Sequence, residues 1–286
     1  MDNYVPKHIP EGINNPPENF LKQFFLFTIG TVVFVGAVFF ILSFFVDHLA
    51  IYMPDSWDRK LRSKFQNVES KMFQGKAVVE SNYLNELILK MDPQLVRYMN
   101  LRIHILCDSN VNAFATVGGD IYVLDGFLQK VETENELVMV LGHELGHFEK
   151  RHHWRSLGDA VIMITMKMAL SAAGIDTLTG VSPDIIFGKF SQKHELEADI
   201  YGINVLNQVY NHVGGYNIFF DKILTIPLDE KGAHHPGRIG SWFSTHPYPA
   251  DRNKILKEYF TTHSMTESAT TKVPTDFKSV CKPVVL

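Results

Sequence analysis

Cysteine, positive charge and internal repeats are all scarce in this sequence of 286 residues. The two cysteines are Cys107, in a predicted strand, and Cys281, in the C-terminal tail, so a disulfide is neither required nor a guide to the compartment. Because 27 Lys and Arg are outnumbered by 31 Asp and Glu, we expect no nucleic-acid partner. Asp2, Glu11 and Glu18 exclude an arginine-rich, acid-poor mitochondrial presequence. No repeat is visible, and the hydrophobic content of 45% is ample for a folded core.

The sequence does contain one long uncharged run, from Phe24 to Val46, rich in Phe, Val, Ile and Leu. Its 23 residues are enough to cross a hydrocarbon core of about 30 Å. The alternatives are a buried helix of the soluble domain and a cleavable signal sequence. The run exceeds a signal core of about 7–15 residues, and no small-residue cleavage site follows it. We therefore expect an uncleaved transmembrane helix over residues 23–46, after a polar, flexible extension over residues 1–22.

Basic residues on either side of this span predict its orientation. Two lysines precede the span, whereas four Lys and Arg lie within residues 59–64. The positive-inside rule therefore places the following domain in the cytoplasm. Because the basic cluster begins more than ten residues beyond the span, a periplasmic domain is the alternative.

A metal-binding pattern follows in the middle of the chain. Thr133 and Glu136 form a capping-box pattern, which predicts a helix that begins near Thr133. On that helix His143 and His147 share a face and can bind one cation, while Glu144 lies about 100° round the axis beside it. This is the His-Glu-x-x-His pattern of zinc peptidases. A motif this short also occurs by chance, so it needs support from the rest of the chain.

A carboxylate ligand is available in a second predicted helix, at residues 191–199. Two histidines and a water leave a tetrahedral zinc ion one protein ligand short, and Glu195 can supply that ligand. Asp199 lies on the same face, where it can accept the ring N–H of a ligating histidine. The small Ala198 lets this helix pack closely against the first. The alternative for these acids is a solvated helix face, to which we assign Glu197.

Three motifs, in this order, resemble those of the family forty-eight metallopeptidases, which include HtpX-type, Oma-type and CAAX-protease relatives. The motifs are His143-Glu144-Leu145-Gly146-His147, Ser191-Gln192-Lys193-His194-Glu195-Leu196-Glu197-Ala198-Asp199 with Gly202, and Ser244-Thr245-His246-Pro247 with Arg252. The resemblance covers residues 112–256. One departure is Gln192, where the family usually has Arg; it leaves the ligands intact but removes an ion pair near the second helix.

The resemblance implies a zincin-like α+β fold, mainly helical with a small hairpin or sheet, over residues 81–260. It implies one zinc ion per chain, held by His143, His147 and Glu195. Glu144 would be the general base, and Asp199 would orient a ligating histidine. His246 would lie near the zinc, either as an oxyanion donor or as a latch in the open coordination position. Arg252 would anchor the His246 loop by pairing with a carboxylate.

Two segments before the first zinc helix have strand patterns. Residues 102–106 alternate and predict a strand with His104 on its outer face, not a ligand. Residues 112–123 predict two strands around a Gly-Gly turn, whose edge can hold an extended peptide over the zinc; the alternative is a purely structural hairpin. Residues 83–91 have helical spacing that ends at Asp92-Pro93.

Four other segments carry weaker patterns. Residues 47–80 are expected to form a juxtamembrane linker that leads into a helix. The apolar run at residues 160–173 is too short to span a membrane and predicts a core or interfacial helix. His234 and His235 are expected to face solvent, and residues 261–286 to be disordered.

Together these patterns predict a single-pass, membrane-anchored zinc metalloendopeptidase, a hydrolase with protein or peptide substrates and the lipid bilayer as partner. Membrane protein quality control at a bacterial inner membrane is the expected role by family analogy. The alternative is a membrane-tethered, zinc-binding chaperone-like or scaffold protein whose latched or inactive site is closed by His246. Glu144, which a structural site does not need, favours the enzyme. One clear span argues against a CAAX-type protease, and the oligomeric state is left open.

Overall fold

The computed structural model of the chain describes residues 19–54, 56–58, 60–63, 71, 73–116, 118–172, 190–224, 246, 251–274 and 280–281. The chain divides into two compact units, Met1–Phe45 and Val46–Leu286, which are described separately. Residues 1–18 of the predicted extension lie outside the described residues, as do His234 and His235.

Helix α1 (Phe20–Ala50) contains the predicted transmembrane run and extends it at both ends. Its start is set by Asn19, whose side chain accepts a hydrogen bond from the Lys22 backbone N–H at 3.2 Å. Its 31 residues correspond to about 46 Å of helix, more than the thickness of a hydrocarbon core. Among the described residues, α1 is the one helix long and apolar enough to cross a membrane.

The second unit contains a mixed four-stranded sheet with the strand order β1-β2-β4-β3. The strands are β1 (Val78–Glu80), β2 (Arg102–Leu106), β3 (Ala113–Ala115) and β4 (Asp120–Leu124). β2 and β4 pair in parallel, whereas β1 pairs antiparallel with β2, and β3 with β4. The predicted strand at 102–106 and the hairpin at 112–123 are confirmed. Gly119 in the hairpin turn has a φ of +87°, which glycine adopts without strain.

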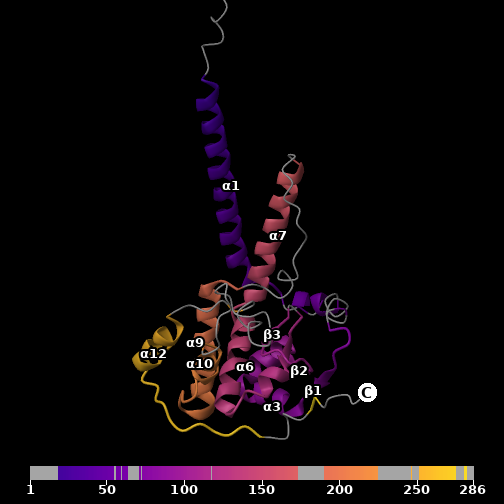
Figure 1. The fold of residues 1–286 in the computed structure, drawn as a ribbon, viewed down its shortest axis with the longest axis vertical. Helices are drawn as coiled ribbons and strands as arrows, with labels where there is room; N and C mark the ends of the chain where they lie inside the picture. The colour runs from indigo at the N-terminus through magenta and orange to yellow at the C-terminus, as the bar shows by residue number, and fades with distance from the viewer. Residues whose placement is uncertain are drawn as a thin grey trace, which may run out of the picture. The chain divides into compact units, whose positions relative to one another are not determined.

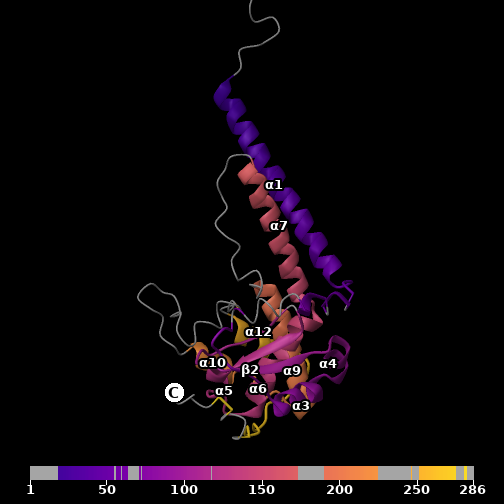
Figure 2. The same cartoon turned by 90° about the vertical axis from the view of Figure 1, so that its right-hand side faces the viewer.

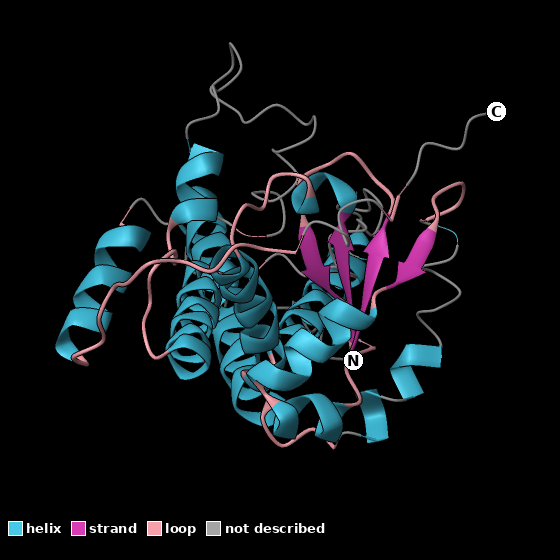
Figure 3. Cartoon of the chain, turned by 90° about the horizontal axis from the view of Figure 1, so that it is seen from below, coloured by secondary structure: helices cyan, strands magenta, loops and turns pink. Residues whose placement is uncertain are grey.

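The longer helices of this unit lie on one side of the sheet (Figure 3). The helices are α3 (Asn82–Met91), α4 (Pro93–Met99), α5 (Asp125–Leu128), α6 (Glu134–Glu149), α7 (His152–Ala172), α9 (Gln192–Tyr210), α10 (Ile218–Leu224) and α12 (Arg252–Thr262). One buried apolar cluster joins α3, α6 and α9 to the facing side chains of β2 and β4. The predicted fold class, mainly helical α+β with a small sheet, is confirmed.

Helices α6 and α9 lie side by side because small residues face each other across their contact (Figures 1 and 2). A Cβ on Gly142 would lie 2.9 Å from Cα of Gly202, and a Cβ on Gly146 would lie 2.9 Å from Cα of Ala198. Ordinary van der Waals contact begins at 3.4 Å, so a side chain at either glycine would force the helices apart. The close packing predicted at Ala198 is confirmed.

Two segments contain order that the sequence does not predict, one in the expected linker and helix at 47–80 and one in the tail. Strand β1 lies within the predicted linker at 47–80 and adds to the sheet by pairing with β2. The predicted disorder over residues 261–286 is wrong for residues 261–274: residues 261–262 end α12, residues 263–264 form a turn, and residues 265–274 run along the domain. There the Glu134 backbone N–H donates to the Thr271 carbonyl at 2.8 Å, and the Val213 N–H donates to Thr266 at 2.8 Å. These bonds use backbone groups, which the side-chain pattern does not reveal.

Helix α7 extends away from the rest of its unit (Figures 1 and 2). Val161 and Met168, in its apolar second half, are 55% and 60% exposed. Ala160 and Ile162, at the start of the run at 160–173, are each 8% exposed, so the run packs against protein at these two positions and is exposed at Val161 and Met168.

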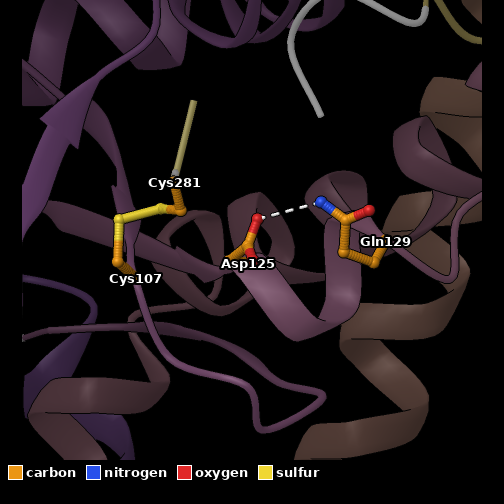
Figure 4. Close-up of a disulfide and its surroundings, with 4 residues drawn as sticks. All are labelled: Cys107, Asp125, Gln129 and Cys281. Atoms are coloured by element: carbon orange, nitrogen blue, oxygen red, sulfur yellow. Dashed lines mark hydrogen bonds between the residues drawn. A yellow bond between two sulfur atoms is a disulfide. The ribbon is translucent and has the colours of Figure 1, made fainter. Parts of the chain in front are cut away.

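A disulfide joins Cys107, directly after β2, to Cys281 in the C-terminal tail (Figure 4). The two Cα atoms are 5.5 Å apart, a common spacing for a disulfide. The bond lies beside α5, where Gln129 Nε2 donates to Asp125 Oδ1 at 3.2 Å. It closes a loop with a sequence separation of 174 residues and ties down the tail.

Candidate metal centre

Helix α6 carries the His-Glu-x-x-His motif through the interior of the domain. The Thr133 hydroxyl accepts the Glu136 backbone N–H at 3.1 Å and caps the helix, as the sequence predicts. The Glu136 carboxylate does not complete a capping box; it accepts the Glu132 N–H at 3.1 Å and pairs with Lys222 at 3.0 Å. Every residue from Asn135 to Phe148 is buried, so the motif is enclosed by protein.

Four side chains converge on one point between α6, α9 and the segment at His246. Ligand atoms of His143, His147, Glu195 and His246 all lie within 4.8 Å of one another, and all four residues are buried. The Nε2 atoms of His143 and His147 are 3.1 Å apart; Glu195 Oε2 lies 3.5 Å from His143 Nε2, and Glu195 Oε1 lies 3.5 Å from His147 Nε2. His246 Nδ1 lies 3.2 Å from His143 Nε2 and 3.2 Å from Glu195 Oε1.

These separations suit a tetrahedral metal ion. With metal–ligand bonds of about 2.0–2.1 Å, neighbouring donors of a tetrahedron lie about 3.3–3.4 Å apart. The nearest contacts between the donor residues run from 3.1 to 3.5 Å, and with one ligand atom taken from each residue all four atoms lie within 4.8 Å of one another. Burial lowers the pKa of both His143 and His147 well below the ordinary value, which keeps the rings neutral, as ligation requires. Imidazole nitrogens with one carboxylate are a donor set that zinc accepts, so the residues fit the metal.

Asp199 and Arg252 lie directly behind His143. Asp199 Oδ1 is 2.8 Å from His143 Nδ1, so the Nδ1–H donates to the carboxylate when Nε2 is directed at a metal. Arg252, at the start of α12, forms an ion pair with the same carboxylate and lies 3.8 Å from the centre of the Phe220 ring. Burial raises the pKa of Asp199 to about 6 against the charge of Arg252. The structure thus brings both residues to the positions that the sequence predicts for them.

Glu144 is buried beside the donor set without belonging to it. Its Oε1 lies 3.5 Å from His246 Nε2. Burial raises the pKa of Glu144 to about 7, against the opposing charge of His246. The backbone of Ala115, on the edge strand β3, faces the same carboxylate, so this edge borders the site. A carboxylate with a pKa near neutrality suits general-base chemistry.

His246 presents one ring nitrogen to the donor set and the other to Glu144. Burial alone would lower the pKa of His246, but the charges of Glu195 and Glu144 raise it overall. His104, by contrast, lies 3.2 Å from Asp120 Oδ1, and it is not part of the donor set, as the sequence predicts.

His147 has a hydrogen-bond partner that the sequence does not indicate. His152 Nδ1 lies 2.9 Å from His147 Nδ1, and His152 Nε2 lies 3.0 Å from Glu197 Oε2. The assignment of Glu197 to a solvated face is therefore incomplete: its side chain is 29% exposed, but its carboxylate also contacts His152 and lies 3.5 Å from Arg155. Burial lowers the pKa of His152. Phe190 stacks on His147 with 3.8 Å between ring centres.

The domain is of the zincin metallopeptidase type. Two helices supply a buried His–His–Glu set, a further glutamate lies beside this set, and an edge strand borders it. Residues 80–260 match the model of Peptidase family M48, and the chain belongs to that family. The resemblance to the family forty-eight metallopeptidases is confirmed. Membership implies a metal cofactor.

Curated relatives share this part of the chain. The metalloprotease LoiP of Escherichia coli is 29% identical over 167 residues, which cover 56% of this chain and 62% of the relative. The beta-barrel assembly-enhancing protease of Escherichia coli is 27% identical over 218 residues, 70% of this chain and 41% of the relative. The mitochondrial metalloendopeptidase OMA1 of Schizosaccharomyces pombe is 29% identical over 164 residues, 55% of this chain and 46% of the relative. The chain thus spans less than two thirds of each relative's length.

Proposed function

We propose that this protein is a membrane-anchored zinc metalloendopeptidase with one zinc ion per chain. The observation that carries the proposal is the buried Glu144 carboxylate, which lies beside the donor set but outside it. Zinc held by His143, His147 and Glu195 would polarise the scissile carbonyl and lower the pKa of a water molecule toward about 7. α1 would be the anchor in the membrane.

The side chains around the metal would have two kinds of role: one transfers protons, and the others position a metal ligand or the substrate. Glu144 takes a proton from the attacking water and passes it to the leaving amine. Asp199 holds the Nδ1–H tautomer of His143, and Arg252 holds Asp199 in place. An extended substrate lies along β3, the outermost strand on its side of the described sheet, where backbone groups of the strand can pair with it.

His246 is proposed to latch the site. Its Nδ1 lies among the donors at 3.2 Å from two of them, the place of a fourth ligand, which favours the latch over the oxyanion donor. With His246 in that place, water and substrate have no open position on the metal. His246 must therefore leave this place before cleavage can begin.

The Cys107–Cys281 disulfide supports a catalytic domain in an oxidising compartment, such as the periplasm. This proposal replaces the cytoplasmic orientation expected from the basic residues at 59–64. By analogy with the name of the beta-barrel assembly-enhancing relative, we propose membrane proteins under quality control as substrates.

The test of the function is zinc content and casein cleavage by the full chain in detergent, for wild type, Glu144→Gln and His246→Ala. We expect one zinc per chain in all three, no cleavage by Glu144→Gln, and faster cleavage by His246→Ala than by wild type. Loss of zinc in Glu144→Gln would show that this residue is a ligand. Bound zinc without cleavage in any variant, His246→Ala included, would favour the membrane-tethered scaffold instead.

The orientation is tested in intact cells with a maleimide polymer that adds mass to free thiols. We expect no mass shift until the protein is reduced, and digestion of the domain by protease added to spheroplasts. Free thiols on a protease-resistant domain would place it in the cytoplasm.

A further inference from the structure

The geometry points to His152 and Glu197 as positioning residues that hold His147 in its metal-binding tautomer and orientation. This inference deepens the proposed function and rests on its metal site. It concerns two residues that are not metal ligands and that neither the His-Glu-x-x-His pattern nor the acidic motif of α9 assigns.

The hydrogen bonds form one consistent chain. When His147 directs Nε2 at the metal, its Nδ1 carries the proton and donates to His152 Nδ1, 2.9 Å away. His152 then carries its own proton on Nε2, which donates to Glu197 Oε2 at 3.0 Å. Each donor in this chain meets one acceptor, so the negative charge of Glu197 fixes the tautomers of both rings.

The backbone explains how His152 reaches His147. On a continuous helix, residues five apart are separated by about 140° and do not face each other. The helix breaks at Arg151, which has a φ of +56°, so α7 starts in a new direction with His152 turned back toward α6. An ion pair of 2.6 Å between Arg151 and the buried Asp58 accompanies this break.

The two metal-binding histidines of α6 are therefore held in different ways. His143 donates directly to a carboxylate of α9, Asp199, at 2.8 Å. His147 reaches the α9 carboxylate Glu197 through His152. Arg155, 3.5 Å from Glu197, and the 4.4 Å stacking of His194 on His152 hold this second chain in place. Both chains end on α9, so this helix supplies a ligand and orients both histidines of the other helix.

The test compares zinc affinity, measured by competition with a chelator, among full-length variants in detergent. His152→Leu removes the acceptor and should weaken zinc binding about 10–100-fold. His152→Asn keeps an acceptor oxygen near the position of Nδ1 and should restore affinity to within a few-fold of wild type. Glu197→Gln, on a partly exposed side chain, should fold normally and weaken binding less than His152→Leu. His153→Gln is the matched control, since His153 is an adjacent buried histidine, 7% exposed against 0% for His152, that contacts Asp58 instead.

A second measurement reads the tautomer directly, by ¹⁵N NMR of histidine-labelled, zinc-loaded protein. We expect the His147 Nδ1–H resonance to shift in His152→Leu and Glu197→Gln but not in His153→Gln. Wild-type affinity in both His152→Leu and Glu197→Gln would overturn the inference. So would equal weakening by His152→Asn and His152→Leu, which would indicate packing rather than hydrogen bonding. A wild-type chain that binds no zinc would instead refute the proposed function.

Discussion

The contact between α6 and α9 at Gly146 makes a quantitative prediction about the metal site. In Gly146→Ala the new Cβ would lie 2.9 Å from Ala198 Cα and 3.0 Å from the Ala198 carbonyl oxygen. Ordinary contact begins at 3.4 Å, and the atoms met, two backbone atoms of Ala198 and Cβ of Tyr201 at 3.0 Å, cannot be moved by a rotamer change. The two helices must therefore separate by about 0.5 Å at this point.

This separation acts on metal binding more than on folding. His143 and His147 lie on α6 and Glu195 on α9, so moving the helices apart stretches the donor set. Metal–ligand distances are held to about ±0.2 Å, so a shift of about 0.5 Å should lower zinc affinity 10-fold or more. Overpacking costs about 1–3 kcal/mol, but alanine regains about 1 kcal/mol over glycine in a helix. The free energy of unfolding of the metal-free chain should thus fall by only about 0–2 kcal/mol.

Chelator competition and urea unfolding in the same detergent measure the two quantities separately. Gly36→Ala is the matched control, because a Cβ on this α1 glycine would meet nothing within 4 Å. Adding Ala198→Gly to Gly146→Ala should not restore zinc affinity, since the clash is with the backbone. Wild-type affinity in Gly146→Ala, or its full recovery in the double variant, would refute the reasoning.

Two further predictions concern stability. Cys281→Ser removes a cross-link over a sequence separation of 174 residues, for which the chain-entropy relation gives about 5 kcal/mol. Chemical denaturation should show that the free energy of unfolding falls by about 2–5 kcal/mol, and reductant should lower that of wild type to the same value. An unchanged denaturation midpoint in Cys281→Ser would show that the disulfide adds no stability. Asp58→Asn breaks the buried pair with Arg151 and should cost about 3 kcal/mol at pH 7. Burial alone would raise the pKa of Asp58, but His153 and Arg151 lower it overall. The ionised Asp58 carboxylate therefore stabilises the fold above a pH of about 4, and this stabilisation is lost as the pH falls through the lowered pKa. Unfolding midpoints of wild type and variant should converge in acid, and a constant offset would contradict this.

The parts of the site that depend on helical periodicity could be predicted from the sequence. A spacing of four residues puts His143 above His147 and Glu195 above Asp199 whatever the surroundings, and the structure brings all four together. The same holds for the alternating strand at 102–106 and the Gly-Gly hairpin. The local sequence pattern alone determines these features, so they can be predicted without knowledge of the tertiary packing.

The features that were missed depend on contacts between distant segments. His152 lies five residues from His147, and only the break at Arg151 turns it back, which no spacing rule anticipates. Glu197 resembles a solvated acid until α7 is placed beside it. Strand β1 and the C-terminal tail are ordered by backbone hydrogen bonds that carry no side-chain signature. The disulfide partners become neighbours only after the tail has been fixed along the domain.

The charges in the centre favour both the metal and catalysis without reference to relatives. Glu144, Glu195 and Asp199 are fully buried. Arg252 is also fully buried, and its guanidinium pairs with the Asp199 carboxylate. With all four groups ionised the cluster carries two net negative charges, which a low-dielectric interior tolerates poorly. A divalent cation on the donor set cancels this charge. A purely structural site would be complete with Glu195 as its carboxylate, and Glu144 would then add a buried charge without a bond to the ion. Its presence is accounted for when Glu144 exchanges a proton with the substrate water.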